Sequence, residues 1–280
     1  MIFSNTPIER YKIGKHEVWV KREDLCVSAE GPTFSKVRGL ESYLKKIKKE
    51  GFSTVGYTET SISMAGWGVS WLASKIGLGS VIFDPQYKKT PGILELHRKQ
   101  WIKYNPEIIP IKAGRAKVNY YISRKILKNK YGDKAILLPL GIPLKETVEE
   151  TVKEVKITRE KNQLDFETVV INVGSGTICA GVTRGFPDKT IYGIMGRKGD
   201  VKRKIKFISQ KGNFYTKGLL GINIKVIDMG WEYTERSKIK SPFPCHPYYD
   251  LKAWEWLIEN ISKLKKPVLF WNIGSIPNIS

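Results

Sequence analysis

The sequence predicts an α/β fold built on open parallel sheets. Short apolar runs rich in β-branched residues alternate with stretches of helical length along most of the chain. One buried-strand pattern, at 168–172, leads directly into a glycine-rich turn. The chain has 280 residues, of which 41% are hydrophobic, which is enough for one large domain or two smaller ones.

The first half of the chain repeats a strand-helix pattern. Parallel strands need crossover connections, and a helix after each strand supplies them. Gly51 is the expected end of the first helix. The expected elements are a strand at 17–25, a helix at 41–50, a strand at 53–57, a helix ending at 76, a strand at 78–84, a helix at 91–104, a strand at 107–111, a basic helix at 116–131 and a strand at 135–138.

The second half continues the pattern after a long charged helix at 145–161, which would bury Val148, Val152 and Val155 on one side. The expected strands that follow lie at 168–172, 192–195, 222–227 and 267–271, and the expected helices follow Gly176, span 201–210 and begin near Asp250.

The net charge is unusually positive. Lysine and arginine number 48 against 27 acidic residues, which gives +21. The excess is concentrated at 99–134 and 197–217. Such a charge attracts polyanions, so nucleic acid is one candidate partner. The alternative is a lysine-rich composition spread over solvated helix faces.

Three isolated cysteines, Cys26, Cys179 and Cys245, have no metal-type spacing and fit a reducing compartment without a disulfide framework. No apolar run approaches a membrane span, and the amino terminus lacks a signal pattern. We therefore expect a soluble cytoplasmic protein without a metal site.

Lys36 is the first candidate for chemistry. It follows a loop of small and turn-forming residues at 31–35 and precedes a helix-like run. A lysine amine attacks a carbonyl only when it is deprotonated, which requires burial or a cationic neighbour, and Arg38 could be that neighbour. The alternative is a solvated charge at the start of a basic helix.

Gly174, Ser175, Gly176 and Thr177 form the second candidate site, directly after the strand at 168–172. Glycines allow backbone N–H groups to approach a phosphate, the hydroxyls add donors, and a helix N-terminus favours an anion. The turn lacks the Lys-Ser/Thr of a P-loop, so an ordinary tight turn is the alternative.

Several segments spread over nearly the whole chain resemble the pyridoxal-phosphate (PLP) enzymes of the tryptophan-synthase-β type, fold type II. The similarity is strongest to the branch of 1-aminocyclopropane-1-carboxylate (ACC) deaminase and D-cysteine desulfhydrase. The matching segments are WVKREDL at 19–25, SKVRGL at 35–40, GSGTICAG at 174–181, PYYDLKA at 247–253 and VLFWNIG at 268–274. The resemblance implies a homodimer of two-domain subunits, with residues 1–50 and 160–280 in a larger cofactor-binding domain and 51–159 in a smaller one.

The resemblance also implies roles for the residues of the cofactor site. Lys36 would form the internal aldimine and move the α-proton, and the 174–177 turn would hold the PLP phosphate. Asp250 would face the pyridine nitrogen; capping the following helix is its alternative role. Tyr249 falls on the catalytic tyrosine, although a loop aromatic packed against Trp254 or Trp256 is the alternative. Tyr233 could be a second catalytic tyrosine.

Ser63 falls on a family serine that engages the substrate carboxylate or acts as a nucleophile. The next position departs from the family, because Met64 replaces an asparagine that lies beside the cofactor's phenolic oxygen and methionine cannot donate that hydrogen bond. Ser35 likewise replaces an asparagine. The substrate-binding segment is therefore remodelled, with Trp67 as a candidate stacking platform.

We predict a PLP-dependent lyase or deaminase that acts on a small amino acid, like ACC deaminase or D-cysteine desulfhydrase, through a Lys36 aldimine and an α-carbanion. One alternative is a PLP enzyme acting on an amino acid or amine linked to a nucleotide or to DNA. The other is a catalytically inactive nucleic-acid-binding relative, against which the presence of Lys36, Tyr249 and Asp250 argues.

Overall fold

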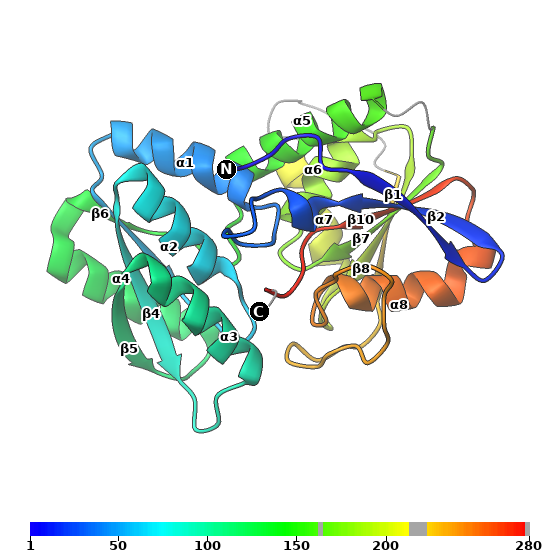
Figure 1. Cartoon of the computed structure of the whole chain (residues 1–280). Coiled ribbons are helices and arrows are strands. Elements are labelled where there is room, and N and C mark those ends of the chain that lie inside the picture. Colours follow the sequence, from blue (N-terminus) through cyan, green and yellow to red (C-terminus); the bar gives the residue numbers. More distant parts are fainter. Residues whose placement is uncertain (162–164, 213–222, 278–280) are drawn as a thin grey trace. The chain divides into compact units, whose positions relative to one another are not determined.

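The computed structural model describes residues 1–161, 165–212 and 223–277, and the chain forms two compact units (Figure 1). Unit 1 comprises Met1–Gly39 and Lys145–Ser280, and unit 2 comprises Leu40–Leu144. Helix α1 (Val37–Lys49) contains the first boundary.

Unit 1 is built on a six-stranded sheet with the order β1-β2-β10-β7-β8-β9. Strand β1 is antiparallel to β2, and the remaining neighbours are parallel. The carboxyl ends of the five parallel strands therefore lie at the same edge of the sheet. The strands are β1 (Ile8–Ile13), β2 (His16–Arg22), β7 (Thr168–Val173), β8 (Thr190–Met195), β9 (Ile224–Asp228) and β10 (Val268–Asn272).

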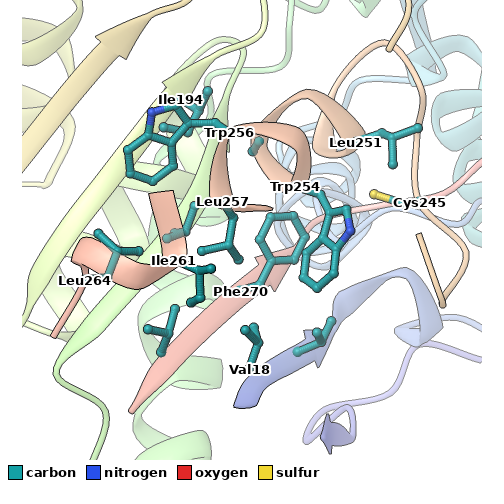
Figure 2. Close-up of a cluster of buried hydrophobic side chains, with 14 of the residues drawn as sticks. Val18, Ile194, Cys245, Leu251, Trp254, Trp256, Leu257, Ile261, Leu264 and Phe270 are labelled. Atoms are coloured by element: carbon teal, nitrogen blue, oxygen red, sulfur yellow. The ribbon is translucent and has the colours of Figure 1, made fainter. Parts of the chain in front are cut away.

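Helices cover both faces of this sheet, so its central strands are apolar on both sides. Side chains of β10 alternate: Phe270 joins the cluster under α8 (Asp250–Asn260), and Trp271 joins the opposite cluster. Figure 2 shows Trp254 and Leu257 of α8 with Phe270 in the first cluster. The second cluster involves α5 (Lys145–Lys161) and α6 (Thr177–Gly185).

Helix α5 packs closely on α6 because glycines of α6 leave room for it. A Cβ at Gly181 would collide with Thr151, and one at Gly185 would collide with Val155. Glu154 of α5 also pairs with buried Lys21 at 2.7 Å. These contacts put α5 in unit 1, whereas the expected boundary at 159/160 assigned it to the smaller domain.

Unit 2 is a four-stranded parallel sheet with the order β5-β4-β3-β6. Its core includes Val81, Phe83, Leu127 and Leu137. The elements are β3 (Thr54–Thr58), α2 (Ala65–Ile76), β4 (Gly79–Gln86), α3 (Gly92–Trp101), β5 (Glu107–Lys112), α4 (Ala116–Tyr131) and β6 (Ala135–Leu137).

Both sheets confirm the predicted α/β class. Two elements differ in detail. The strand expected at 17–25 is β2, which pairs with the preceding β1 and ends at Arg22 before a 3-10 turn, and the helix expected at 91–104 ends in a 3-10 turn after Trp101. The expected start of the strand at 222 lies outside the described residues. Among the described residues, no helix has the length and apolar character needed to cross a bilayer.

Candidate active site

Lys36 lies at the carboxyl end of β10, because the loop before α1 is attached there. The N–H of Ser35 donates to the carbonyl oxygen of Ile273 at 3.1 Å, and Phe34 forms a β-bridge with Gly274. From this position the Lys36 amine donates a 3.2 Å hydrogen bond to Ser175 Oγ. The two segments that the sequence singled out are therefore adjacent in unit 1.

The environment of Lys36 favours its neutral, nucleophilic form. Burial lowers the pKa of the amine to about 8, helped by the charge of Lys204 and opposed by that of Asp250. Arg38, the cationic neighbour expected from the sequence, instead pairs with Glu23 and lies 3.6 Å from a carboxylate oxygen of Glu154. The expectation for Arg38 is wrong because buried carboxylates engage its guanidinium.

The glycine turn has the form of an anion cradle. Gly176 has φ +93° and precedes α6, whose N-terminal N–H groups point into the turn. The hydroxyls of Ser175 and Thr177 lie 3.0 Å apart. A Cβ at Gly176 would come within 3.1 Å of Ile208 and 3.2 Å of Phe207, so helix α7 (Val201–Gly212) packs directly behind the turn.

These features fit a phosphorylated aldehyde cofactor. A buried amine with a lowered pKa stands beside hydroxyl donors and a helix N-terminus that suit a phosphate. Among the described residues, no cluster of three or more His, Cys, Asp or Glu side chains has the arrangement of a metal site.

Asp250 is buried at the start of α8 and faces the end of β10. Its Oδ1 accepts the N–H of Ile273 at 3.0 Å. Burial raises the pKa of the carboxyl to about 7, an effect that the charge of Asp24 increases and hydrogen bonds from Ile273 and Gly274 oppose. In its ionised form this carboxyl can accept a hydrogen bond from a protonated ring nitrogen, and a neighbouring cation would favour that form.

Tyr249 precedes Asp250 and packs against a histidine. Its ring centroid lies 4.7 Å from that of buried His246, and Asn172 Nδ2 donates to its carbonyl oxygen at 2.8 Å. Trp254 packs instead on Phe243 and Phe270 in the core. The predicted catalytic role of Tyr249 stays a prediction.

Tyr233 lies in the loop after β9, with the Arg197 guanidinium 5.7 Å from its ring centroid. Arg197 is in electrostatic contact with Lys204, the neighbour of Lys36. Tyr233 contacts Arg197, whose charge acts on Lys204, and Lys204 donates to the carbonyl oxygen of Gly174 in the turn. The catalytic role of Tyr233 also stays a prediction.

Ser63 belongs to unit 2, where it is part of a buried polar cluster at the start of α2. It bonds to the carboxyl of Glu59, which also accepts N–H groups of Thr60 at 2.9 Å and Gly66 at 2.8 Å. Burial raises the pKa of Glu59 to about 8. His97, fully buried, bonds to the Ser63 backbone, yet burial lowers its pKa to about 4.

Trp67 does not present a stacking platform, because its side chain is only 3% exposed.

Two residues of these sites, Glu59 and Lys204, were not predicted from the sequence. Lys204 could have been found from topology: β8 neighbours β7 in a parallel sheet, so the basic segment after β8 must lie near the glycine turn after β7. Nothing comparable in the sequence distinguishes Glu59 from a surface glutamate.

A scan against models of known protein families finds no match. The chain is 34% identical to the "Glycyl-dTMP PLP-dependent decarboxylase" of Pseudomonas phage M6, over 98% of this chain and 100% of that protein.

Three solved structures share the fold at lower identity. A homologue of ACC deaminase has a TM-score of 0.81 at 21% identity, covering 99% of this chain and 91% of that one. A hydrogen sulfide-producing enzyme from Fusobacterium nucleatum gives 0.66 at 14%, covering 98% and 96%. A PLP-dependent aspartate racemase gives 0.66 at 14%, covering 98% and 91%.

Proposed function

Because the chain belongs to the family of fold-type-II PLP-dependent enzymes that includes the phage decarboxylase, we propose that it decarboxylates an amino acid attached to a pyrimidine nucleotide. The observation that carries this proposal is the full-length similarity to a protein named for glycyl-dTMP. In the proposed reaction, the bond between Cα and the carboxyl carbon breaks, CO₂ leaves, and a proton takes its place on Cα.

The cofactor is PLP, which supplies an electron sink for the electron pair left by the departing CO₂. Lys36 and the 174–177 turn are the residues we propose to hold it. The proposal is supported by the lowered pKa of the Lys36 amine and by the donors of the turn. Asp250 would bind the protonated pyridine nitrogen, with its carboxylate form favoured by that cation.

Proton delivery to Cα needs a group that exchanges protons near neutral pH. The Lys36 amine, with a pKa of about 8, meets this requirement. Tyr249, whose ring packs at a tilt against His246, is the second candidate. From the resemblance alone, we propose that Ser63 engages the substrate carboxylate.

A second candidate function is the lyase or deaminase reaction on a free small amino acid. It is favoured by Tyr249 and Asp250, which occupy adjacent positions in the loop and at the start of α8, as the resemblance to ACC deaminase requires. The two functions differ in their products, because a decarboxylase releases CO₂ and a deaminase or desulfhydrase releases ammonia.

The test is to incubate the PLP-loaded protein with glycyl-dTMP labelled in its carboxyl group, and separately with ACC and D-cysteine. We expect labelled CO₂ and a nucleotide lighter by one CO₂. Lys36→Met should abolish the release, and Lys265→Ala, an exposed lysine at the opposite edge of the sheet, should retain it. Ammonia from ACC or D-cysteine without CO₂ would instead establish the second function.

The basic surface supports a nucleic-acid-linked substrate. Helix α4 exposes Lys117, Arg124, Lys125 and Lys128, and Lys130 pairs with Glu107. We propose that this face contacts a polyanion such as DNA.

We also propose, from the resemblance alone, that the protein is a homodimer.

A further inference from the structure

Three cations of unit 1 lie together beside the glycine turn: Arg197, Arg203 and Lys204, named here the cation cluster. Lys204 on α7 donates a 2.7 Å hydrogen bond to the carbonyl oxygen of Gly174. Burial lowers the pKa of Lys204, and the charges of Arg197 and Arg203 lower it further, so both guanidinium groups lie within electrostatic range of the Lys204 amine.

The nearby acids are engaged elsewhere. The carboxylate of Asp200 accepts a 3.0 Å hydrogen bond from the backbone N–H of Arg203. Asp228 accepts the backbone N–H groups of Gly199 and Gly230, and Glu232 pairs with Lys198. Within the described ranges, no carboxylate forms an ion pair with the cation cluster. Like charges that no ion pair compensates repel each other, so a bound anion would stabilise this arrangement.

The two arginines of the cluster are accessible to a phosphate that arrives from solvent. Arg197 and Arg203 are exposed, whereas Lys204 is partly buried against the turn. The ring of Tyr233 supports the Arg197 guanidinium from one side. Guanidinium groups offer paired donors that match phosphate oxygens. The turn, the N-terminus of α6 and Lys204 already provide donors for the cofactor phosphate, so the two exposed arginines exceed what the cofactor needs.

We propose that the cation cluster binds the phosphate of the nucleotide that carries the substrate amino acid. This inference deepens the proposed function and rests on it for the identity of the nucleotide. It assigns the exposed side of the cluster, Arg197 and Arg203, to substrate recognition, and Lys204 to the junction with the cofactor cradle.

The experiment measures binding of dTMP and of thymidine to the PLP-loaded protein by calorimetry. We expect thymidine to bind about tenfold or more weakly than dTMP, because it lacks the phosphate. The double variant Arg197→Ala/Arg203→Ala should lose about 10- to 100-fold in dTMP affinity and leave thymidine affinity unchanged. Lys265→Ala, which removes one charge at the opposite edge of the sheet, is the matched control.

A parallel titration of the cofactor-free apoprotein with PLP, followed by visible absorption, tests whether the cluster binds the phosphate of the cofactor or that of the nucleotide. The double variant should bind PLP within about twofold of the wild type. Weakened PLP binding with unchanged dTMP binding would assign the cluster to the cofactor and overturn the proposal. Equal binding of dTMP and thymidine, or no effect of the double variant, would overturn it as well.

These results are independent of the decarboxylation assay. Loss of dTMP affinity in the double variant supports the phosphate site even if labelled glycyl-dTMP releases no CO₂, in which case only the proposed reaction fails. Release of CO₂ with no difference between nucleotide and nucleoside supports the reaction and rejects the site.

Discussion

The amino group of Lys36 donates a 3.2 Å hydrogen bond to Ser175 Oγ, although the two residues are 139 positions apart. The contact joins the loop before α1 to the turn after β7 at the carboxyl edge of the unit 1 sheet. It exists because β10, which holds the Lys36 loop, is the direct neighbour of β7. This adjacency places a nucleophile beside an anion cradle, and the following predictions start from it.

Lys36 should capture PLP at neutral pH. With a pKa of about 8, about a tenth of its amines are neutral at pH 7, against fewer than about one in a thousand at the ordinary lysine pKa. Borohydride reduction followed by peptide mapping should find the cofactor on Lys36, and capture should rise with pH to a midpoint near 8. Lys252, whose pKa burial also lowers to about 8, is the internal control, because its amine already donates to the carbonyl of Gly196 at 2.7 Å. An adduct on Lys252 would contradict the assignment.

Lys204→Met should raise the pKa of Lys36, because the charge of Lys204 is the second cause of its depression. The midpoint of PLP capture should therefore move to higher pH. Lys204→Arg keeps the charge and should retain most of the depression. An unchanged midpoint in Lys204→Met would show that burial alone sets the reactivity of Lys36.

Because of Asp250, the stability of the apoprotein should fall as pH rises from about 4 to about 7. Its folded pKa of about 7 lies above the unfolded value, so the protonated form stabilises the fold at low pH. That contribution is lost between about pH 4 and 7, at up to about 1.4 kcal/mol per pH unit. Asp250→Asn should flatten this part of the stability curve in denaturant unfolding.

The same variant should lower the reaction rate of the loaded enzyme about 10- to 100-fold, since an amide cannot hold the pyridine nitrogen in its protonated form.

Gly176→Ala should destabilise the cradle by about 1–3 kcal/mol, because the turn needs φ +93° and a Cβ would press on Ile208 and Phe207. Gly174→Ala is the matched control, since no atom lies within 4 Å of a Cβ there. Thermal unfolding should separate the two variants. Equal melting temperatures would mean that α7 moves away without cost.

Glu59→Gln should weaken the start of α2 by about 1–3 kcal/mol, because a glutamine cannot accept both N–H groups that the carboxyl oxygens bind. Burial raises the folded pKa of Glu59 to about 8, so the free energy of unfolding of the wild type should fall as pH rises toward 8. Glu59→Gln has no carboxyl at this position and should lack that fall. If Ser63 engages the substrate, KM should rise in Glu59→Gln more than kcat falls. A fall in kcat alone would argue against that role.

DNA affinity, if the basic face of α4 contacts DNA, should fall steeply with salt. Each phosphate contact contributes about −0.9 to the slope of log affinity against log salt. Replacing both Arg124 and Lys125 with alanine should reduce the slope by about 2, and Lys265→Ala should leave it unchanged. If none of these variants changed the slope, α4 would not be part of the DNA-binding surface.

The sequence by itself determined the α/β class and most element positions, which depend on local information: strand and helix periodicity and the glycine turn after a buried strand. The cofactor was implied by the resemblance of short motifs, among them the segment that contains Lys36, to a known family. Local pattern was also enough to indicate the basic segment at 197–217, although not its purpose.

The tertiary structure decided which charges meet. Arg38, two positions from Lys36, is engaged by the buried carboxylate of Glu23, whereas Lys204, far away in sequence, lowers the pKa of Lys36. The same holds for Glu59, whose raised pKa arises from burial that no spacing in the sequence reveals. Electrostatic effects depend on distance and burial in space, and parallel-sheet crossovers bring together residues that the chain keeps apart.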